Sequence, residues 1–225
     1  GAEKPHEWIR STGAGMWRST GDIFDNWNSV KNIIMQQVDI TCEYKNDEGS
    51  MPFGGIGCFN DMDMLIVGMH GKGNVGLAGC SDVQYQTHYA LWAFLGSPLM
   101  IGCDIREMSD ETRRILMNDE MIRINQDPLC RQPYKVKNHA WNDNVLIYVK
   151  ALANGNLAIG MFNLSDEKSR AAMNLDEIGL PFSTGRTLEL TEVWTCENLC
   201  ANNASLVTEL EPFASKVYRA KVVKL

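Results

Sequence analysis

The stretch that decides the fold lies near the start of the chain and reads Trp17-Arg18-Ser19-Thr20-Gly21-Asp22-Ile23-Phe24-Asp25-Asn26-Trp27. Gly21 permits a tight turn after a short strand, and Asp25 or Asn26 can cap a helix whose apolar residues follow at helical spacing. A second stretch also ends an apolar run with acidic residues: Phe59-Asn60-Asp61-Met62-Asp63-Met64-Leu65. Strand-turn-helix units in this order predict a parallel α/β fold, whose functional groups gather where strands lead into helices.

The rest of the first half continues this alternation of strands and helices. Strands are expected at 14–20, 54–59 and 99–102, the last of a buried type, and helices at 5–12, 26–37, 81–95 and 109–117. From residue 145 the pattern changes to strands without long helices, and Asn154-Gly155 is a strong signal for a hairpin turn. We therefore expect an α/β part at 1–137 and an antiparallel β-sandwich at 138–225.

Composition excludes several classes of function. The formal net charge of -7 leaves no excess of Lys or Arg to bind phosphates, so we expect no nucleic-acid partner. The longest apolar runs are far too short to span a bilayer, so we expect no membrane partner. No signal peptide is visible, and seven scattered cysteines are more typical of reduced thiols than of a disulfide framework. These features together favour a cytoplasmic location.

The two acidic turns are the best indication of function. Each places Asp residues among Trp, Phe, Met and Ile, and a carboxylic acid kept away from water holds its proton more readily. Such a group can serve as the general acid of a glycosidase. Asp22 is the candidate acid, against the alternative that it only caps the next helix. Arg18, four residues earlier, could hold a substrate hydroxyl or form a surface ion pair.

Asp61 and Asp63 lie two positions apart, which on an extended segment would place both carboxylates on one side. Two neighbouring carboxylates in an apolar frame need cations, hydroxyls or Arg as partners. Sugar hydroxyls suit them, whereas a solvated acidic loop is the simpler alternative. A Mg²⁺ or Ca²⁺ site lacks a third nearby oxygen donor at motif spacing.

Several other features have ordinary structural interpretations. Asp104 and Arg106 follow a strand end and are expected to form a buried ion pair. The aromatic residues at 81–97 fit a core face better than a binding site. The pair Cys196 and Cys200 is interpreted as a turn with two thiols rather than a metal site. Glycines between 71 and 79 predict a mobile rim, and the acceptor patterns for glycosylation at Asn163 and Asn203 are frequent by chance.

Taken in order, these motifs resemble glycoside hydrolase family 27, which contains α-galactosidases and α-N-acetylgalactosaminidases. Residues 17–23 are similar to the family's Trp-Arg-x-x-(Gly/Ala)-Asp-Ile turn, and 60–65 to Asn-Asp-Pro-Asp-Met-Leu, with Met62 in place of Pro. Residues 91–93, 97–99 and 124–129 resemble the passages Leu-Trp-Ala, Ala-Pro-Leu and Val-Asn-Gln-Asp-Pro-Leu. The start of the family's C-terminal β domain is matched at 149–165. The resemblance covers essentially the whole chain.

This resemblance implies a (β/α)8 barrel followed by a β-sandwich, and a retaining hydrolase that removes terminal non-reducing α-D-galactose. Asp22 would be the general acid/base. Arg18 and Asp63 would bind sugar hydroxyls, with Asp61 supporting them and Met64 lining the pocket. We expect no cofactor and no metal, and the expected partner is an α-galactoside-containing carbohydrate.

The sequence departs from the family in one respect. The family nucleophile is an Asp in a Lys-x-Asp motif on a barrel strand that precedes the acid turn, and residues 1–16 contain no such motif. A barrel typically needs about 250 residues, so we expect strands six to eight plus the β domain, and no activity from this chain alone. The expected partners also include a second copy of the chain or a missing N-terminal barrel segment, and when that segment is supplied we expect activity that depends on Asp22. Alternatives are an α-N-acetylgalactosaminidase, a non-catalytic carbohydrate-binding or structural fragment, and a metal-dependent barrel hydrolase or lyase.

Overall fold

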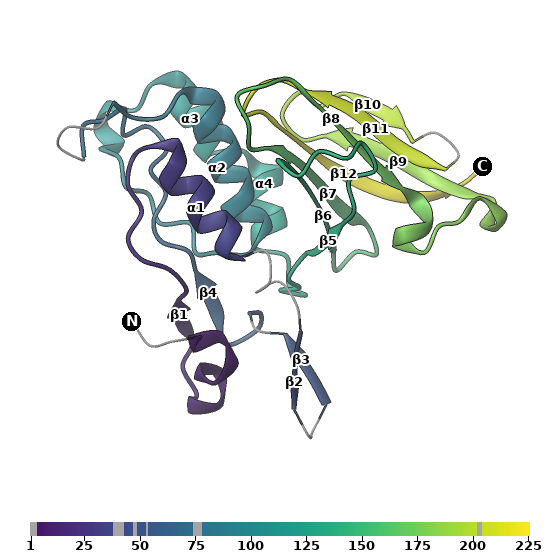
Figure 1. Ribbon diagram of the computed structural model, residues 1–225, viewed down its shortest axis with the longest axis horizontal. Helices are drawn as coiled ribbons and strands as arrows, with labels where there is room; N and C mark the ends of the chain where they lie inside the picture. Colours follow the sequence, from purple (N-terminus) through teal and green to yellow (C-terminus); the bar gives the residue numbers. More distant parts are fainter. Residues whose placement is uncertain (1–3, 38–42, 47–48, 53, 74–77, 202–203) are drawn as a thin grey trace. The chain divides into compact units, whose positions relative to one another are not determined.

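The computed structural model describes residues 4–37, 43–46, 49–52, 54–73, 78–201 and 204–225. The chain divides into two compact units, Gly1–Gln132 and Pro133–Leu225. Figure 1 shows helices in the first unit and β-sheet in the second. Among the described residues, the helices are too short or too polar to cross a membrane.

The first unit is built around short parallel strands. β1 (Met16–Arg18) pairs in parallel with β4 (Phe59–Asp61), in the register Arg18 to Asp61. Leu65 then forms a parallel bridge with Ile101. The predicted parallel α/β arrangement is thus present as a partial barrel, with a β-sandwich after it, and the predicted fold class is confirmed.

Helices connect and cover these strands. α1 (Trp27–Gln37) begins after Asn26, whose side-chain oxygen accepts the Ser29 amide at 2.9 Å, so the predicted cap is Asn26. α1 packs beside α2 (Asp82–Phe94), as Figure 1 shows. Ser81 caps α2 with a full capping box. The remaining helical elements of the unit are η1 (Pro5–Glu7), η2 (Ile9–Thr12), η3 (Ile105–Glu107), α3 (Asp110–Leu116) and α4 (Asp119–Asn125).

Two strands of this unit do not lie where the sequence predicted them. The strand expected at 54–59 is a tight turn closed by two hydrogen bonds between Gly55 and Cys58, and β4 begins only at Phe59. The strand expected at 99–102 is reduced to the bridge at Ile101, whose side chain is 46% exposed rather than buried. An unpredicted antiparallel hairpin, β2 (Glu43–Asn46) and β3 (Gly49–Pro52), precedes that turn.

One polar interpretation was also wrong, whereas the interpretation of the Asn163 acceptor pattern as a chance match agrees with the structure. Asp104 and Arg106 do form an ion pair at 2.7 Å, but the Arg106 side chain is 84% exposed, so the pair lies in water at a 3₁₀ turn. The Asn163 side chain is fully buried and donates to the carbonyl oxygens of Glu167 and Glu211, at 2.7 and 3.0 Å. A buried amide committed to two carbonyls is not free to carry a glycan. Asn203 lies outside the described residues.

The second unit is an antiparallel β-sandwich. One sheet has six strands in the order β10-β9-β12-β7-β6-β5, and the other pairs β11 with β8. The strands are β5 (Tyr134–Val136), β6 (Val145–Ala151), β7 (Leu157–Asn163), β8 (Ser169–Asn174), β9 (Arg186–Glu192), β10 (Asn198–Cys200), β11 (Ser205–Leu210) and β12 (Ser215–Lys224). Two 3₁₀ turns, η4 (Leu175–Ile178) and η5 (Phe182–Thr184), lie between β8 and β9.

The core of the sandwich is contributed by both sheets. Ile147, Ile159 and Tyr218 from the large sheet join Met173 and Leu206 from the small one in a single buried cluster. The predicted hairpin between β6 and β7 is present, with Gly155 at a φ of +78°. β5 and β10 were not predicted, because short edge strands carry too few residues to show a period of two.

Candidate active site

The two acidic turns lie at the same edge of the first unit because β1 and β4 run in parallel. Arg18 and Asp61 are register partners at the ends of these strands, so the segments after them start side by side. The Ser19 amide donates to the Asp61 carbonyl at 3.1 Å and continues the ladder into the turns. Residues more than forty positions apart are thereby brought to one place.

Asp63 is the residue that joins the two turns. Its carboxylate accepts hydrogen bonds from the Ile23 amide at 2.7 Å and from the Met64 amide at 2.6 Å, and Arg18 Nη2 binds it directly. The side chain is only 13% exposed. The backbone of Asp63 has a φ of +86°, a conformation uncommon outside glycine and concentrated at functional sites.

Asp22 lies on the solvent side of this junction. Arg18 Nη2 contacts its Oδ1 at 3.2 Å, so one guanidinium faces both Asp22 and Asp63. The expectation that the turn keeps this carboxylate away from water was wrong, since the Asp22 side chain is 87% exposed. The apolar residue of the turn that enters the core is Ile23, and its neighbour Asp22 therefore points outward.

Asp61 has a structural task. Its Oδ1 accepts the amide of Asp63 at 2.9 Å, an Asx-type turn that reverses the chain after β4. The sequence predicted that the side chains of Asp61 and Asp63 point to the same side of an extended segment. This prediction was wrong, because the positive φ of Asp63 interrupts the extended backbone conformation. The carboxylate of Asp61 holds the backbone, whereas that of Asp63 faces Arg18.

Met64 follows directly and is 40% exposed. It lies against the strand remnant that contains Gly102, where an added Cβ would come within 3.1 Å of the Met64 sulfur and 2.7 Å of the Leu65 carbonyl oxygen. Gly102 thus allows this close approach. The structure brings together all five residues predicted for the site, and no group of three His, Cys, Asp or Glu that could hold a metal occurs among the described residues.

Comparison with known proteins identifies the family. Residues 4–127 match the family model described as alpha galactosidase A, and residues 142–220 match that of the alpha galactosidase C-terminal beta sandwich domain. The chain belongs to the alpha galactosidase A family. The resemblance to glycoside hydrolase family 27 is thereby confirmed.

Individual relatives agree with this assignment. This chain is 32% identical to the alpha-galactosidase of Cyamopsis tetragonoloba over 97% of this chain and 47% of that protein. It is also 32% identical to the alpha-N-acetylgalactosaminidase of Gallus gallus, over 80% of this chain and 40% of that protein. A crystal structure of a candidate alpha-galactosidase/melibiase from Bacteroides fragilis has a TM-score of 0.83 and 31% identity, covering 97% of this chain and 45% of the other. The chain spans less than half the length of these three proteins.

The second acidic turn of this chain is also held by side chains for which the sequence predicted no functional role. The Trp92 indole Nε1 donates to the Asp63 carbonyl at 2.8 Å, and the Ile66 amide donates to His88 Nε2 at 3.1 Å. The rings of His88 and Trp92 contact each other edge to face, with centroids 4.1 Å apart. Burial lowers the pKa of His88 to about 3, which keeps the ring neutral and able to accept the amide. The sequence shows that His88 and Trp92 are four positions apart on a predicted helix. It did not predict that their polar atoms reach the second acidic turn.

The first acidic turn is anchored by Asp25, which was considered as a helix cap. Asp25 is fully buried, and its carboxylate accepts the Tyr85 hydroxyl at 2.8 Å, the Gly71 amide at 2.7 Å and the Cys80 amide at 3.2 Å. Burial raises the pKa of Cys80 to about 12, with Asp25 adding to the shift. Asp25 therefore anchors both described ends of the glycine-rich loop, whereas residues 74–77, in the middle of the expected mobile rim, lie outside the described residues.

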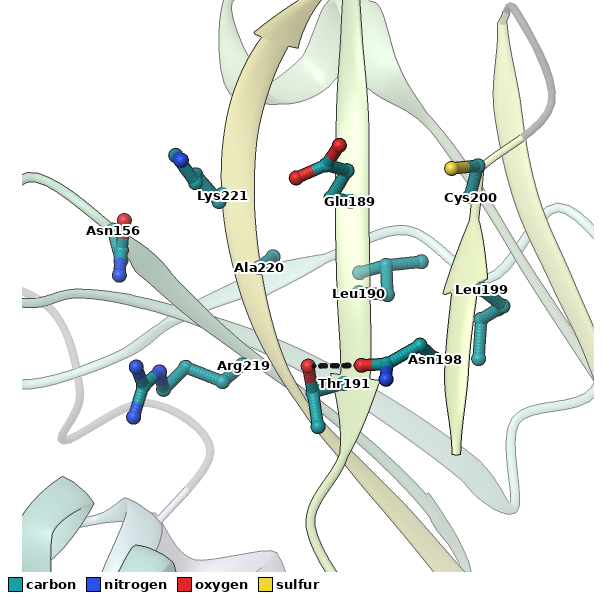
Figure 2. A pocket seen from close by; sticks show the side chains of 10 residues that line it. All are labelled: Asn156, Glu189, Leu190, Thr191, Asn198, Leu199, Cys200, Arg219, Ala220 and Lys221. Atoms are coloured by element: carbon teal, nitrogen blue, oxygen red, sulfur yellow. Dashed lines mark hydrogen bonds between the residues drawn. The ribbon is translucent and has the colours of Figure 1, made fainter. Parts of the chain in front are cut away.

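A separate concavity lies on the six-stranded sheet of the sandwich (Figure 2). It has a volume of about 550 Å³ and is lined by residues of β9, β10 and β12 together with Asn156. Thr191 donates to Asn198 at 2.7 Å across its floor. Among the described residues, its lining includes no aromatic side chain on which a sugar ring could stack, and Glu189 is the one carboxylate. The candidate site is therefore the pair of acidic turns.

Proposed function

We propose that this chain supplies the general acid/base and the sugar-binding groups of a retaining α-galactosidase that removes terminal non-reducing α-D-galactose. The observation that carries the proposal is the position of Arg18, which faces Asp22 on one side and Asp63 on the other. Membership of the alpha galactosidase A family supports the choice of sugar.

The exposure of Asp22 suits an acid/base. Its carboxyl group can approach a glycosidic oxygen, donate a proton to the leaving group and then take a proton from the attacking water. Arg18 beside it fixes the orientation of the carboxyl group. The guanidinium of Arg18 and the carboxylate of Asp63 can bind hydroxyls of the sugar, while Asp61 holds the turn and Met64 lines the site.

The nucleophile has to be a different carboxylate. Both oxygens of Asp63 already accept backbone amides, and Asp61 accepts the amide of Asp63. Both carboxylates are therefore engaged in holding the backbone of the two turns. Retaining enzymes place nucleophile and acid about 5–5.5 Å apart, so we propose that a carboxylate outside these residues is brought opposite Asp22 in the active enzyme.

Hydrolysis of an aryl α-galactoside tests this division of roles. We expect no turnover by the pure chain, and turnover when it is co-expressed with the N-terminal part of a relative such as the Cyamopsis tetragonoloba enzyme. In that complex Asp22→Asn should lower turnover by about 10²–10⁴-fold. Asp104→Asn, which changes an exposed carboxylate, should leave it unchanged. Turnover by the pure chain that Asp22→Asn abolishes would contradict the missing nucleophile, and full activity of Asp22→Asn in the complex would contradict the acid/base.

Azide gives a second test of the acid/base. In the complex carrying Asp22→Gly, azide can attack the galactosyl-enzyme without a general base. The expected product is α-galactosyl azide, because the second displacement restores the configuration of the substrate. An increase in turnover without this product would assign a different role to Asp22.

An α-N-acetylgalactosaminidase is the second candidate, and the similarity to the Gallus gallus enzyme favours it. Parallel measurements with aryl α-galactoside and aryl α-N-acetylgalactosaminide distinguish the two by their kcat/KM. A non-catalytic carbohydrate-binding role predicts galactose binding with no hydrolysis in any complex.

A further inference from the structure

We propose that one face of α2, carrying Tyr85, His88 and Trp92, positions the two acidic turns relative to each other. The three residues are spaced by three and then four positions, so they lie on the same side of the helix. All three are completely buried. The inference rests on the proposed function only in that these turns carry the catalytic acid and the sugar-binding carboxylate.

The C-terminal part of this face holds the second turn. Trp92 binds the carbonyl of Asp63 and His88 binds the amide of Ile66, so two backbone groups on either side of Met64 are fixed by one helix. Ser97, just beyond the helix, accepts the amide of Met62 at 3.1 Å. These contacts sustain the positive φ of Asp63, a strained conformation that persists only where its surroundings impose it.

The N-terminal part of the same face holds the first turn. Tyr85 donates to the buried carboxylate of Asp25, which lies three residues after Asp22. The Tyr85 oxygen also accepts the amide of His70 at 2.8 Å. Tyr85 therefore reaches the first turn through Asp25, as Trp92 reaches Asp63 in the second.

The two halves of this arrangement meet at Ile23. Its amide, one residue after Asp22, donates to the Asp63 carboxylate at 2.7 Å. If α2 positions both turns, loosening either anchor should weaken this hydrogen bond. Tyr85, His88 and Trp92 are positioning residues in this sense, because they act through Asp25 and through the backbone of 63–66.

Amide hydrogen exchange of the ¹⁵N-labelled chain, followed by NMR, tests the proposal without any enzymatic activity. We expect Trp92→Phe to accelerate exchange at Ile23 and Met64 by about tenfold or more relative to the wild type. Tyr85→Phe should accelerate exchange at Gly71, Cys80 and Ile23. The shared effect on Ile23 is the decisive result, and the Ile23 amide proton should also shift upfield in both variants as its hydrogen bond lengthens.

Tyr89→Phe is the matched control. Tyr89 is buried on the same helix, but its hydroxyl donates to the Leu116 carbonyl at 3.1 Å, away from both turns. This variant should leave Ile23 unchanged. The amide of Ile122, which bonds within α4 to the Asn118 carbonyl, reports any general loss of stability. Equal acceleration at Ile122 and Ile23, or an Ile23 response no larger than that of Tyr89→Phe, would overturn the proposal.

A measurement on the unaltered chain covers the case in which a variant does not fold. The indole N–H of Trp92 should exchange as slowly as the amides of Ile23 and Met64, because all three protons are freed by the same local opening. Exchange of the indole proton at the rate of an exposed tryptophan would refute the anchoring of Asp63 by α2. None of these outcomes depends on whether the assembled enzyme cleaves galactosides.

Discussion

The amide of Ile23 donates a 2.7 Å hydrogen bond to the carboxylate of Asp63, forty positions later in the chain. This single contact ties the turn of the proposed acid to the turn of the proposed sugar-binding group. It also explains why Asp63 is shielded while Asp22 is exposed. The backbone of the first turn covers one carboxylate and leaves the other in solvent.

Asp63→Asn should destabilise the first unit by about 2 kcal/mol, since it removes one of the two carboxylates that face Arg18, and an amide oxygen accepts from fewer donors than a carboxylate. Asp61→Asn is the matched variant. An Asn oxygen can still accept the amide of residue 63 and form the turn, so its cost should be under about 1 kcal/mol. Urea unfolding followed by tryptophan fluorescence measures both. An Asp61→Asn cost equal to or above that of Asp63→Asn would contradict the assigned roles.

His88 should make stability depend on pH. Its pKa is lowered by burial from 6.5 to about 3, so between these values the unfolded chain binds more protons than the folded one. The stabilisation is complete above pH 6.5 and is lost as the pH falls toward 3, by up to about 1.4 kcal/mol per pH unit.

Urea midpoints between pH 4.5 and 7 measure this dependence. His88→Gln, which keeps an acceptor for the Ile66 amide, should flatten it. His70→Gln changes a side chain that is 43% exposed and should preserve the slope. An equal slope in the wild type and His88→Gln would mean that other groups cause the dependence.

Gly79→Ala should be far more costly than Gly13→Ala. Both glycines have φ near +80°, but a Cβ on Gly79 would lie 2.5 Å from the Gly71 nitrogen, whereas a Cβ on Gly13 meets nothing within 4 Å. We expect about 3 kcal/mol for the first and about 1 kcal/mol for the second. Thermal unfolding of the two variants measures both losses of stability, and the difference between them is the cost of the steric clash at Gly79. Equal losses of stability would show that residues 70–71 can move away from the added Cβ.

Cys80 should resist alkylation at pH 8. Its pKa is raised to about 12 by burial and the nearby Asp25, and a thiol reacts through its thiolate. Cys196 and Cys200 are exposed and should be labelled first. Brief treatment with iodoacetamide and peptide mass spectrometry gives the order, and unfolding in guanidinium should abolish the difference. Labelling of Cys80 in the fast phase of the native chain would contradict the buried network around Asp25.

Much of the fold could be predicted from local signals. The capping residues Ser81 and Ser109, the spacing of Trp27, Val30 and Ile33 in α1, and the turn at Asn154-Gly155 act within a few positions of themselves. The strands at 54–59 and 99–102 were misplaced because glycine-rich apolar runs fit a turn or an edge as well as a strand. The hairpin of β2 and β3 was missed, as were the short edges β5 and β10.

Sequence motifs alone selected Arg18, Asp22, Asp61, Asp63 and Met64 and the family to which the chain belongs. They gave each carboxylate a role only through the family resemblance and did not show how each is held, because the exposure of Asp22, the turn-forming bond of Asp61 and the triple engagement of Asp63 depend on which strand ends meet. Only the tertiary structure showed that Asp25, Tyr85, His88 and Trp92 support these turns. Residue types and short spacings record local preferences, whereas hydrogen bonds between distant segments exist only after packing has brought their donors and acceptors together.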